Sequence, residues 1–214
     1  MAAGKNVKFQ GSQISIATTK ATAKAITAIS QANPAVVTST AHGYTVGQLV
    51  FIAAVVGMTE LNGDWYYVQN PLANTFELRG IDSTGYGAYA SGGTAQSAVF
   101  VNWCECKGWN ESGGSSAEID VSTVCSTTKE YELGLSDTST VAIDFNYVPK
   151  TTTQIFLEAA KLTGETVPMR VTFPSAAGVL TYKVGILQLS RNGQIGAVWM
   201  GSTNLRIKEN PFLA

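Results

Sequence analysis

The chain has 214 residues, of which 45% are hydrophobic and only 14% are charged, and its formal net charge is −1. Soluble proteins usually have about 25% charged residues. The hydrophobic content excludes a disordered chain, and the near-neutral charge excludes a polyanion-binding protein of the strongly basic type. A surface so poor in charge favours cover by other protein, although a Ser/Thr-rich β domain can also be charge-poor as a monomer.

The few charges are unevenly distributed along the chain. Residues 1–59 have four lysines and no acid, residues 60–158 have 13 acids and four bases, and residues 159–214 have six bases and two acids. The three segments therefore have net charges of +4, −9 and +4. This pattern fits either neutralisation within one fold or pairing of the acidic face of one subunit with the basic ends of another.

No segment indicates membrane insertion or export. No stretch reaches the roughly 18 apolar residues of a membrane span, and residues 1–13 lack the apolar core of a signal peptide. We therefore expect the chain to stay in the compartment where it is made. Its cysteines, Cys104, Cys106 and Cys125, are odd in number, which indicates free reduced thiols rather than a disulfide framework.

Alternation of apolar and polar residues predicts many short strands separated by Gly and Asn turns. Residues 141–147 (VAIDFNY) show this pattern most clearly. Together the segments predict a mainly β fold, a sandwich or barrel. The expected strands are residues 14–18, 25–30, 35–40, 48–53, 65–69, 75–79, 98–103, 141–147, 167–173, 180–186, 195–200 and 204–208.

Residues 32–96 differ in composition from the rest of the chain, because they are rich in aromatic residues and in turn motifs such as Asn62-Gly63. Polar, small residues border this segment at 31–34 and 94–97. We expect a small β-barrel module, residues 32–96, inserted into a β-sandwich domain formed by residues 1–31 and 97–214.

Residues 107–116 (KGWNESGGSS) form the Gly/Ser-rich segment of the chain and include Trp109. The segment is either a long hairpin loop that docks on a partner or a mobile surface loop. If it docks, the contact residues are Lys107, Trp109, Gly113 and Gly114, with Trp109 as the anchor, because aromatic residues dominate binding energy at interfaces.

One helix is expected at residues 152–163. Thr151 and Gln154 fit a capping box, and Gly164 fits a helix-terminating position. Ile155, Ala159 and Leu162, widened by Phe156 and Ala160, form a stripe with helical spacing, which predicts packing of this face against a sheet.

Residues for catalysis or metal binding are sparse. The single histidine, His42, precedes a glycine in a turn, and no acid lies near it in the sequence. Cys104 and Cys106 lack the spacing of a zinc site. We expect no enzyme activity, cofactor or metal; a cysteine hydrolase using Cys104 or Cys125 with His42 is the weakest of the functions considered.

Residues 41–50 (AHGYTVGQLV), 57–63 (GMTELNG), 73–78 (ANTFEL) and 82–93 (DSTGYGAYASGG) resemble the FCCH-like module, the first catalytic-cysteine half-domain named after ubiquitin-activating enzymes. In tailed-phage virion proteins this module is a bare β fold. The resemblance therefore implies a structural role and no activating chemistry.

Residues 117–123 (AEIDVST), the strand at 141–148, the helix and the tail ending in 204–208 (NLRIK) resemble the tail tube protein of long-tailed phages. This family implies a structural virion protein, made in the host cytoplasm, that assembles into stacked hexameric rings. DNA passes through the lumen during ejection without specific binding. The family also implies contacts with tape-measure, tail terminator and tip proteins.

The acidic middle of the chain then predicts an acidic lumen, which repels DNA phosphates. The expected lumen residues are Glu118, Asp120, Glu130, Glu132 and Asp144. An alternative function is a carbohydrate- or host-surface-binding module that uses the aromatic residues of 32–96. Assembly into rings or tubes would distinguish the two.

Overall fold

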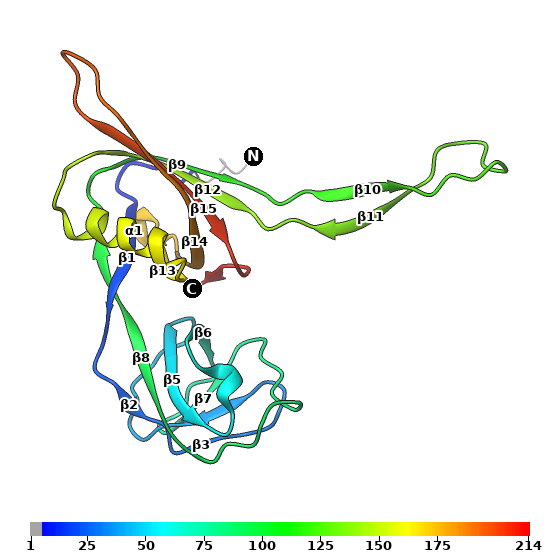
Figure 1. The fold of residues 1–214 in the computed structure, drawn as a ribbon, viewed down its shortest axis with the longest axis vertical. Coiled ribbons are helices and arrows are strands. Elements are labelled where there is room, and N and C mark those ends of the chain that lie inside the picture. The colour runs from blue at the N-terminus through cyan, green and yellow to red at the C-terminus, as the bar shows by residue number, and fades with distance from the viewer. Residues whose placement is uncertain (1–5) are drawn as a thin grey trace, which may run out of the picture.

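The computed structural model describes residues 6–214 and is mainly β, with one α-helix in that range. Figure 1 shows a central body, a small unit below it, a long two-stranded arm and a second, shorter hairpin. The elements are β1 (Gln13–Lys20), β2 (Lys24–Ala25), β3 (Ala28–Ile29), β4 (Val36–Thr38), β5 (Leu49–Val56), β6 (Asp64–Gln69), β7 (Thr75–Leu78), β8 (Ser91–Asn102), β9 (Cys106–Ser112), β10 (Ser116–Asp120), β11 (Tyr131–Ser136), β12 (Thr140–Asn146), α1 (Thr152–Thr163), β13 (Val167–Thr172), β14 (Val179–Asn192), β15 (Met200–Ile207) and β16 (Phe212–Leu213).

The predicted fold class is confirmed, although the strands do not close into a barrel within residues 6–214. Twelve strands follow one another in a continuous antiparallel path, β3-β4-β7-β6-β5-β8-β1-β13-β14-β15-β12-β9, with β2 and β16 paired beside it. Strands β10 and β11 form the arm as a separate two-stranded sheet. The alternation that predicted the strands also directs their faces: Val141, Ile143 and Phe145 of β12 are buried, and Asp144 between them is exposed.

The body has its own hydrophobic core. Strands β12 to β15, the start of β1 and the helix α1 contribute to it, and Trp103 packs against Phe145 with ring centroids 4.8 Å apart. A second core fills the small unit, which is formed by β2 to β7 and the first part of β8, and this core includes Ile26, Ile29 and Ala95. Strand β8 runs unbroken from the small unit into the body, so the polar residues 94–97 form strand rather than the expected loop. The division at residue 96 remains a prediction.

The helix begins and ends as predicted, but its cap and its buried face differ. Gly164 has φ +70° and its N–H donates to the Ala160 carbonyl, as expected of a terminating glycine. Thr151 makes no side-chain cap bond. The predicted stripe of Ile155, Ala159 and Leu162 is wrong, because Ile155 is 55% and Leu162 89% exposed, whereas Phe156 and Ala160, which were expected to widen it, do pack against the core of the body.

The buried face instead consists of Thr153, Gln154, Leu157 and Ala160. The Gln154 amide explains why this face turns inward. Its Oε1 accepts from the Val148 N–H (3.1 Å) and its Nε2 donates to the Asn146 carbonyl (3.1 Å), so it fixes the strand-to-helix connection. A capping box would need the same amide at the N-cap, and the two arrangements exclude each other.

Replacing Gln154 should therefore cost stability. In Gln154→Ala the N–H of Val148 and the carbonyl of Asn146 each lose a part-buried hydrogen bond, which together costs about 1–3 kcal/mol of unfolding free energy. Ile155→Ala, on the exposed face, should change that free energy by about 0.5 kcal/mol or less. Urea unfolding of both variants measures the difference, and equal losses would contradict this role of Gln154.

Two sequence expectations for loops and strands are also wrong. Residues 107–112 are not a loop but most of strand β9, which pairs with β12 from Ser112↔Thr140 to Cys106↔Phe145. Residues 195–199 are not strand: they lie in the turn of the β14–β15 hairpin, and β15 begins at Met200. The long hairpin of this region is the arm, between β9 and β12 (Figure 1).

Candidate functional site

The four-stranded layer β14-β15-β12-β9 ends in two open edges. Strand β9 pairs with β12 on one side only. Strand β14 pairs with β13 along residues 179–184, so along 185–192 its side away from β15 has no strand partner in the described chain. Unpaired backbone N–H and C=O groups at such edges can pair with a strand of another molecule. Because β14 and β9 are the two outer strands of one layer, the open edges lie on opposite sides of it, and copies of this chain can join head to tail.

The outward face of this layer is polar and nearly free of charge. The register aligns Gly108, Asp144 and Ser202 across three strands, and Asn110, Ala142 and Asn204 in the next row. Among the described residues of the four strands, Asp144 provides the one carboxylate of this face. Its one guanidinium, that of Arg206, donates to Asp137 Oδ1 (2.6 Å). The other side chains of the face are Ser112, Thr140, Asn146, Gln188, Ser190, Asn192 and one exposed apolar side chain, Met200.

The arm carries four of the five predicted lumen acids. Glu118 lies opposite Leu133, Glu132 opposite Ile119, and Asp120 opposite Tyr131. Glu130 lies at the turn, where its carbonyl accepts from the Val121 N–H. The structure therefore places Glu118, Asp120, Glu130 and Glu132 on the arm, with Glu118 and Asp120 on one face of it and Glu132 on the other, and it places Asp144 apart from them, on the body.

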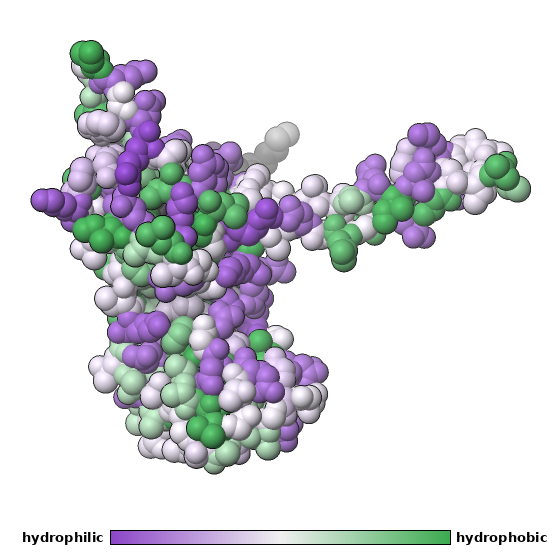
Figure 2. Space-filling view, viewed as in Figure 1, coloured by the Kyte–Doolittle hydropathy of each residue, from purple (hydrophilic) through white to green (hydrophobic). Residues whose placement is uncertain are grey.

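The same arm exposes large apolar side chains. Leu133 and Leu135 are 77% and 95% exposed, and Figure 2 shows hydrophobic side chains along the arm. Exposed apolar groups on this scale mark a surface that another molecule covers. The other exposed apolar residues of the arm are Ile119, Val121, Val124 and Tyr131.

The residues proposed for a docking loop lie at the edge of the body and the base of the arm. Trp109 is half-buried, pairs across the ladder with Ile143 and lies 5.6 Å from Tyr182 between ring centroids. Its environment is core packing, so the premise that it projects from a loop is wrong. Lys107 is exposed on β9, and the glycines start the arm, where a Cβ at Gly114 would clash with the Asp137 carbonyl.

The residues considered for catalysis are not assembled. His42 is buried in the small unit, where Nδ1 accepts from the Tyr44 N–H (3.0 Å) and Nε2 contacts the Thr75 carbonyl (3.2 Å). Cys104 follows β8, Cys125 lies in the turn of the arm, and burial raises the pKa of the Cys106 thiol.

Within residues 6–214 no group of three or more His, Cys, Asp or Glu side chains could hold a metal ion. The described helices include none long and apolar enough to cross a membrane.

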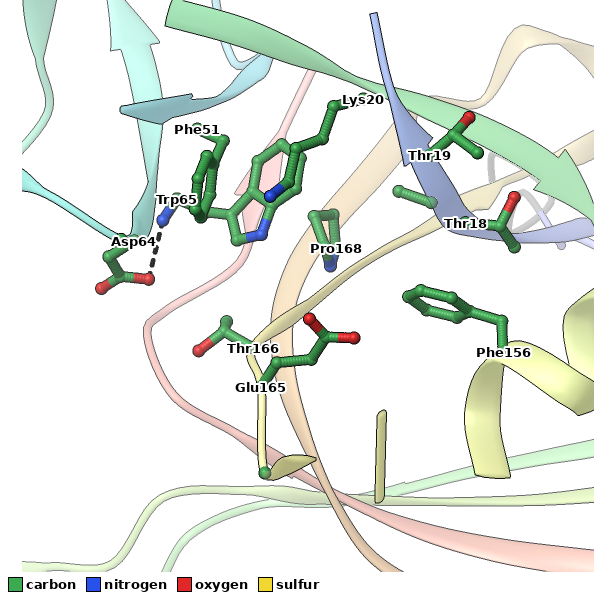
Figure 3. A pocket seen from close by; sticks show the side chains of 13 residues that line it. Thr18, Thr19, Lys20, Phe51, Asp64, Trp65, Phe156, Glu165, Thr166 and Pro168 are labelled. Atoms are coloured by element: carbon green, nitrogen blue, oxygen red, sulfur yellow. Dashed lines mark hydrogen bonds between the residues drawn. The ribbon is translucent and has the colours of Figure 1, made fainter. Parts of the chain in front are cut away.

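Most aromatic residues of the small unit form packing rather than an open binding face, and Tyr86 and Tyr89 are half-buried against its core. Tyr44, Trp65, Tyr66 and Tyr67 are all buried. A cavity of about 470 Å³ lies between the small unit and the body. Figure 3 shows Lys20 beside the Phe51 and Trp65 rings on one side of it, with Phe156 and Pro168 across from them. The Lys20 Nζ lies 3.3 Å from the Phe51 ring centroid, so this amine already covers the aromatic surface that a sugar would need.

Sequence reasoning missed two features of these surfaces. The apolar turn at 193–199 (GQIGAVW) was expected to be strand in part, although its two glycines and lack of alternation are typical of a turn. The contacts of Phe212 with the small unit had no sequence signal, because Phe212 and its partner Tyr67 are far apart in the chain.

Comparisons with known proteins support part of this description. Residues 32–98 match the family model of the ubiquitin-activating enzyme E1 FCCH domain, in agreement with the resemblance of residues 32–96. A search of curated proteins finds no match to the chain. Among solved structures, the chain is similar to one described as the tail of an empty GTA particle with C6 symmetry, at 12% identity and a TM-score of 0.44, covering 54% of this chain and 86% of the other. The family match covers less than half of the chain, so what is established is an FCCH-like segment within a larger β protein.

Proposed function

We propose that this chain is a structural subunit of a long-tailed phage tail tube, which joins head to tail into rings that stack into the tube. The two open edges of the β14-β15-β12-β9 layer carry this proposal. Strand β9 of one copy pairs antiparallel with residues 185–192 of β14 in the next. Head-to-tail contacts of this kind generate closed rings when the rotation between copies closes. The ring number of six follows from the family resemblance.

In such a ring the polar face of the layer lines the channel. Hydroxyl and amide side chains, with the single carboxylate of Asp144, offer few counterion-releasing contacts to DNA phosphates, so DNA passes without binding. The lumen is then closer to neutral than the sequence predicted. Of the five predicted lumen acids, Asp144 is the one that lies on the wall of the channel. The small unit, which contains residues 32–96, decorates the tube.

The arm connects one ring to the next. Its exposed apolar residues and four acids suit a neighbouring subunit whose covering surface is apolar and basic. Here Glu118, Asp120, Glu130 and Glu132 act at a contact between rings. Contacts with tape-measure, terminator and tip proteins belong to the ends and the interior of the assembled tube.

Ring formation is tested at the open edge of β14. Leu187 lies at a register shift between β14 and β15 and is exposed. Leu187→Pro removes a backbone N–H from this bulged position, where proline is tolerated. We expect the purified wild-type protein to form rings or tubes in negative-stain electron microscopy, and Leu187→Pro to remain monomeric in sedimentation.

Leu187→Ala is the matched control, because it removes the same side chain and keeps the N–H, and it should still assemble. A wild-type protein that stays monomeric and shifts on addition of a glycan would contradict the tube and favour the carbohydrate-binding module. Assembly of Leu187→Pro at the wild-type level would show that this edge is not the contact.

A further inference from the structure

The tip of the β14–β15 hairpin is an exposed apolar surface separate from the arm. Residues 193–199 contain no charged side chain. Ile195 is 108% exposed, and Val198 and Trp199 are also exposed. Figure 1 shows this hairpin projecting from the body, and Figure 2 shows hydrophobic side chains at its end. A projecting apolar turn without charge is typical of a segment that inserts into another protein surface.

A cavity of about 190 Å³ lies near the start of β9. Trp103 lines it and is only 2% exposed, yet its indole Nε1–H has no hydrogen-bond partner among the described residues. A buried N–H without a hydrogen-bond partner is costly, so the packing around Trp103 is not optimal in the single copy. The remaining lining residues are Phe9, Ser12, Gln13, Ile14, Asn102, Cys104 and Cys106.

The strand register places tip and cavity at the same end of the layer. Met200, which follows the tip, lies opposite Asn146, and the neighbouring Phe145 lies opposite Cys106. Within one copy, β14 and β9 lie at opposite sides of the layer. In the proposed ring, β14 of the next copy lies antiparallel beside β9, and its tip then reaches the turn at residues 103–105, next to the cavity.

We infer that the hairpin tip of one copy inserts into the Trp103 cavity of the next copy, with Ile195 as the apolar anchor. This inference rests on the proposed ring and adds a second contact to it. Backbone hydrogen bonds between edge strands do not depend on the side chains. The fit of the tip into the cavity does depend on them, so it selects another copy of this chain over an unrelated strand edge. The occupant of the cavity is a second copy of this chain. When β14 of that copy pairs with β9 and extends the layer, its apolar tip comes to lie next to the cavity.

Disulfide trapping tests the contact. In a Cys125→Ser background, which removes the thiol of the arm, Ile195→Cys introduces a thiol at the tip, and Cys104 provides an exposed native thiol at the cavity. Oxidation of assembled rings with diamide should convert most of the protein into covalent dimers and higher multimers that a reducing agent dissolves. Leu72→Cys in the same background, exposed on the small unit, should give no such ladder.

A second variant measures how much Ile195 contributes to assembly, without forming a disulfide bond. Ile195→Asp should leave the melting temperature of the monomer unchanged, because Ile195 contacts solvent there, and should lower the yield of rings at least tenfold. Rings that form normally, without a ladder from Ile195→Cys and with an unchanged yield for Ile195→Asp, would overturn the tip contact and leave the tube function standing. Failure of the wild-type protein to form rings would overturn the proposed function itself.

Discussion

A variant in which residues 113–139 are replaced by Asn-Gly is expected to keep the body folded and to form single rings that no longer stack into tubes. Ser112 and Thr140 are directly paired at the end of β9 and β12, so a two-residue Asn-Gly turn closes this hairpin. No residue of 113–139 belongs to the three hydrophobic cores of residues 6–214. The body loses the exposed Asp137–Arg206 ion pair, worth about 0.5 kcal/mol.

The measurements are the length of the assemblies in electron micrographs and the melting temperature of the subunit. Two full-length variants separate the contributions of the arm. Leu133→Ser with Leu135→Ser removes apolar surface, and Glu118→Gln with Glu132→Gln removes charge without changing shape. We expect the leucine pair to weaken stacking more, since apolar burial dominates association. Tubes of wild-type length from the arm-deleted variant would show that the arm is not the contact between rings.

Phe212→Ala is expected to loosen the small unit from the body and to cost about 2–3 kcal/mol of unfolding free energy. Phe212 of β16 packs against the junction core, in which Leu49, Trp65 and Tyr67 are buried. The Arg79 guanidinium lies 5.3 Å from the Phe212 ring centroid. The ring also fills the space next to Gly47, where a Cβ would clash with it.

Polar contacts act at the same junction. The Tyr67 hydroxyl donates to the Thr181 carbonyl (2.9 Å), and the Lys183 ammonium lies 3.7 Å from Asp64 and 3.1 Å from Glu209. These bonds join the small unit, strand β14 and the C-terminal segment. Loss of the Phe212 ring exposes them to water, which weakens them further.

The matched control is Leu213→Ala, because Leu213 is the neighbouring residue of β16 and is exposed. It should change the unfolding free energy by about 0.5 kcal/mol or less. Urea unfolding measures both variants, and limited proteolysis near residues 20–24 and 79–90 reports the looser junction. A Phe212→Ala protein that unfolds and is cleaved like the wild type would show that the small unit is held without this ring.

Local patterns were sufficient for much of the secondary structure. The alternation in 141–147 predicted β12 and its buried face, and Gly164 predicted the end of α1, because each depends on residues near in the chain. The motifs of residues 32–96 identified the FCCH-like segment. The helix face was beyond such reasoning: the sets 155/159/162 and 153/157/160 both have helical spacing, and the bonds of Gln154 to the preceding strand end decide between them.

The sequence by itself determined that this protein is mainly β, poor in charge and acidic in its middle, because composition and residue order define these properties directly. Only the tertiary structure decided where the charges and free surfaces lie. It moved four acids onto the arm, made a strand of the segment around Trp109, and left β9 and part of β14 unpaired. These features depend on which distant strands pair, and side-chain alternation specifies the faces of a strand but not its neighbours.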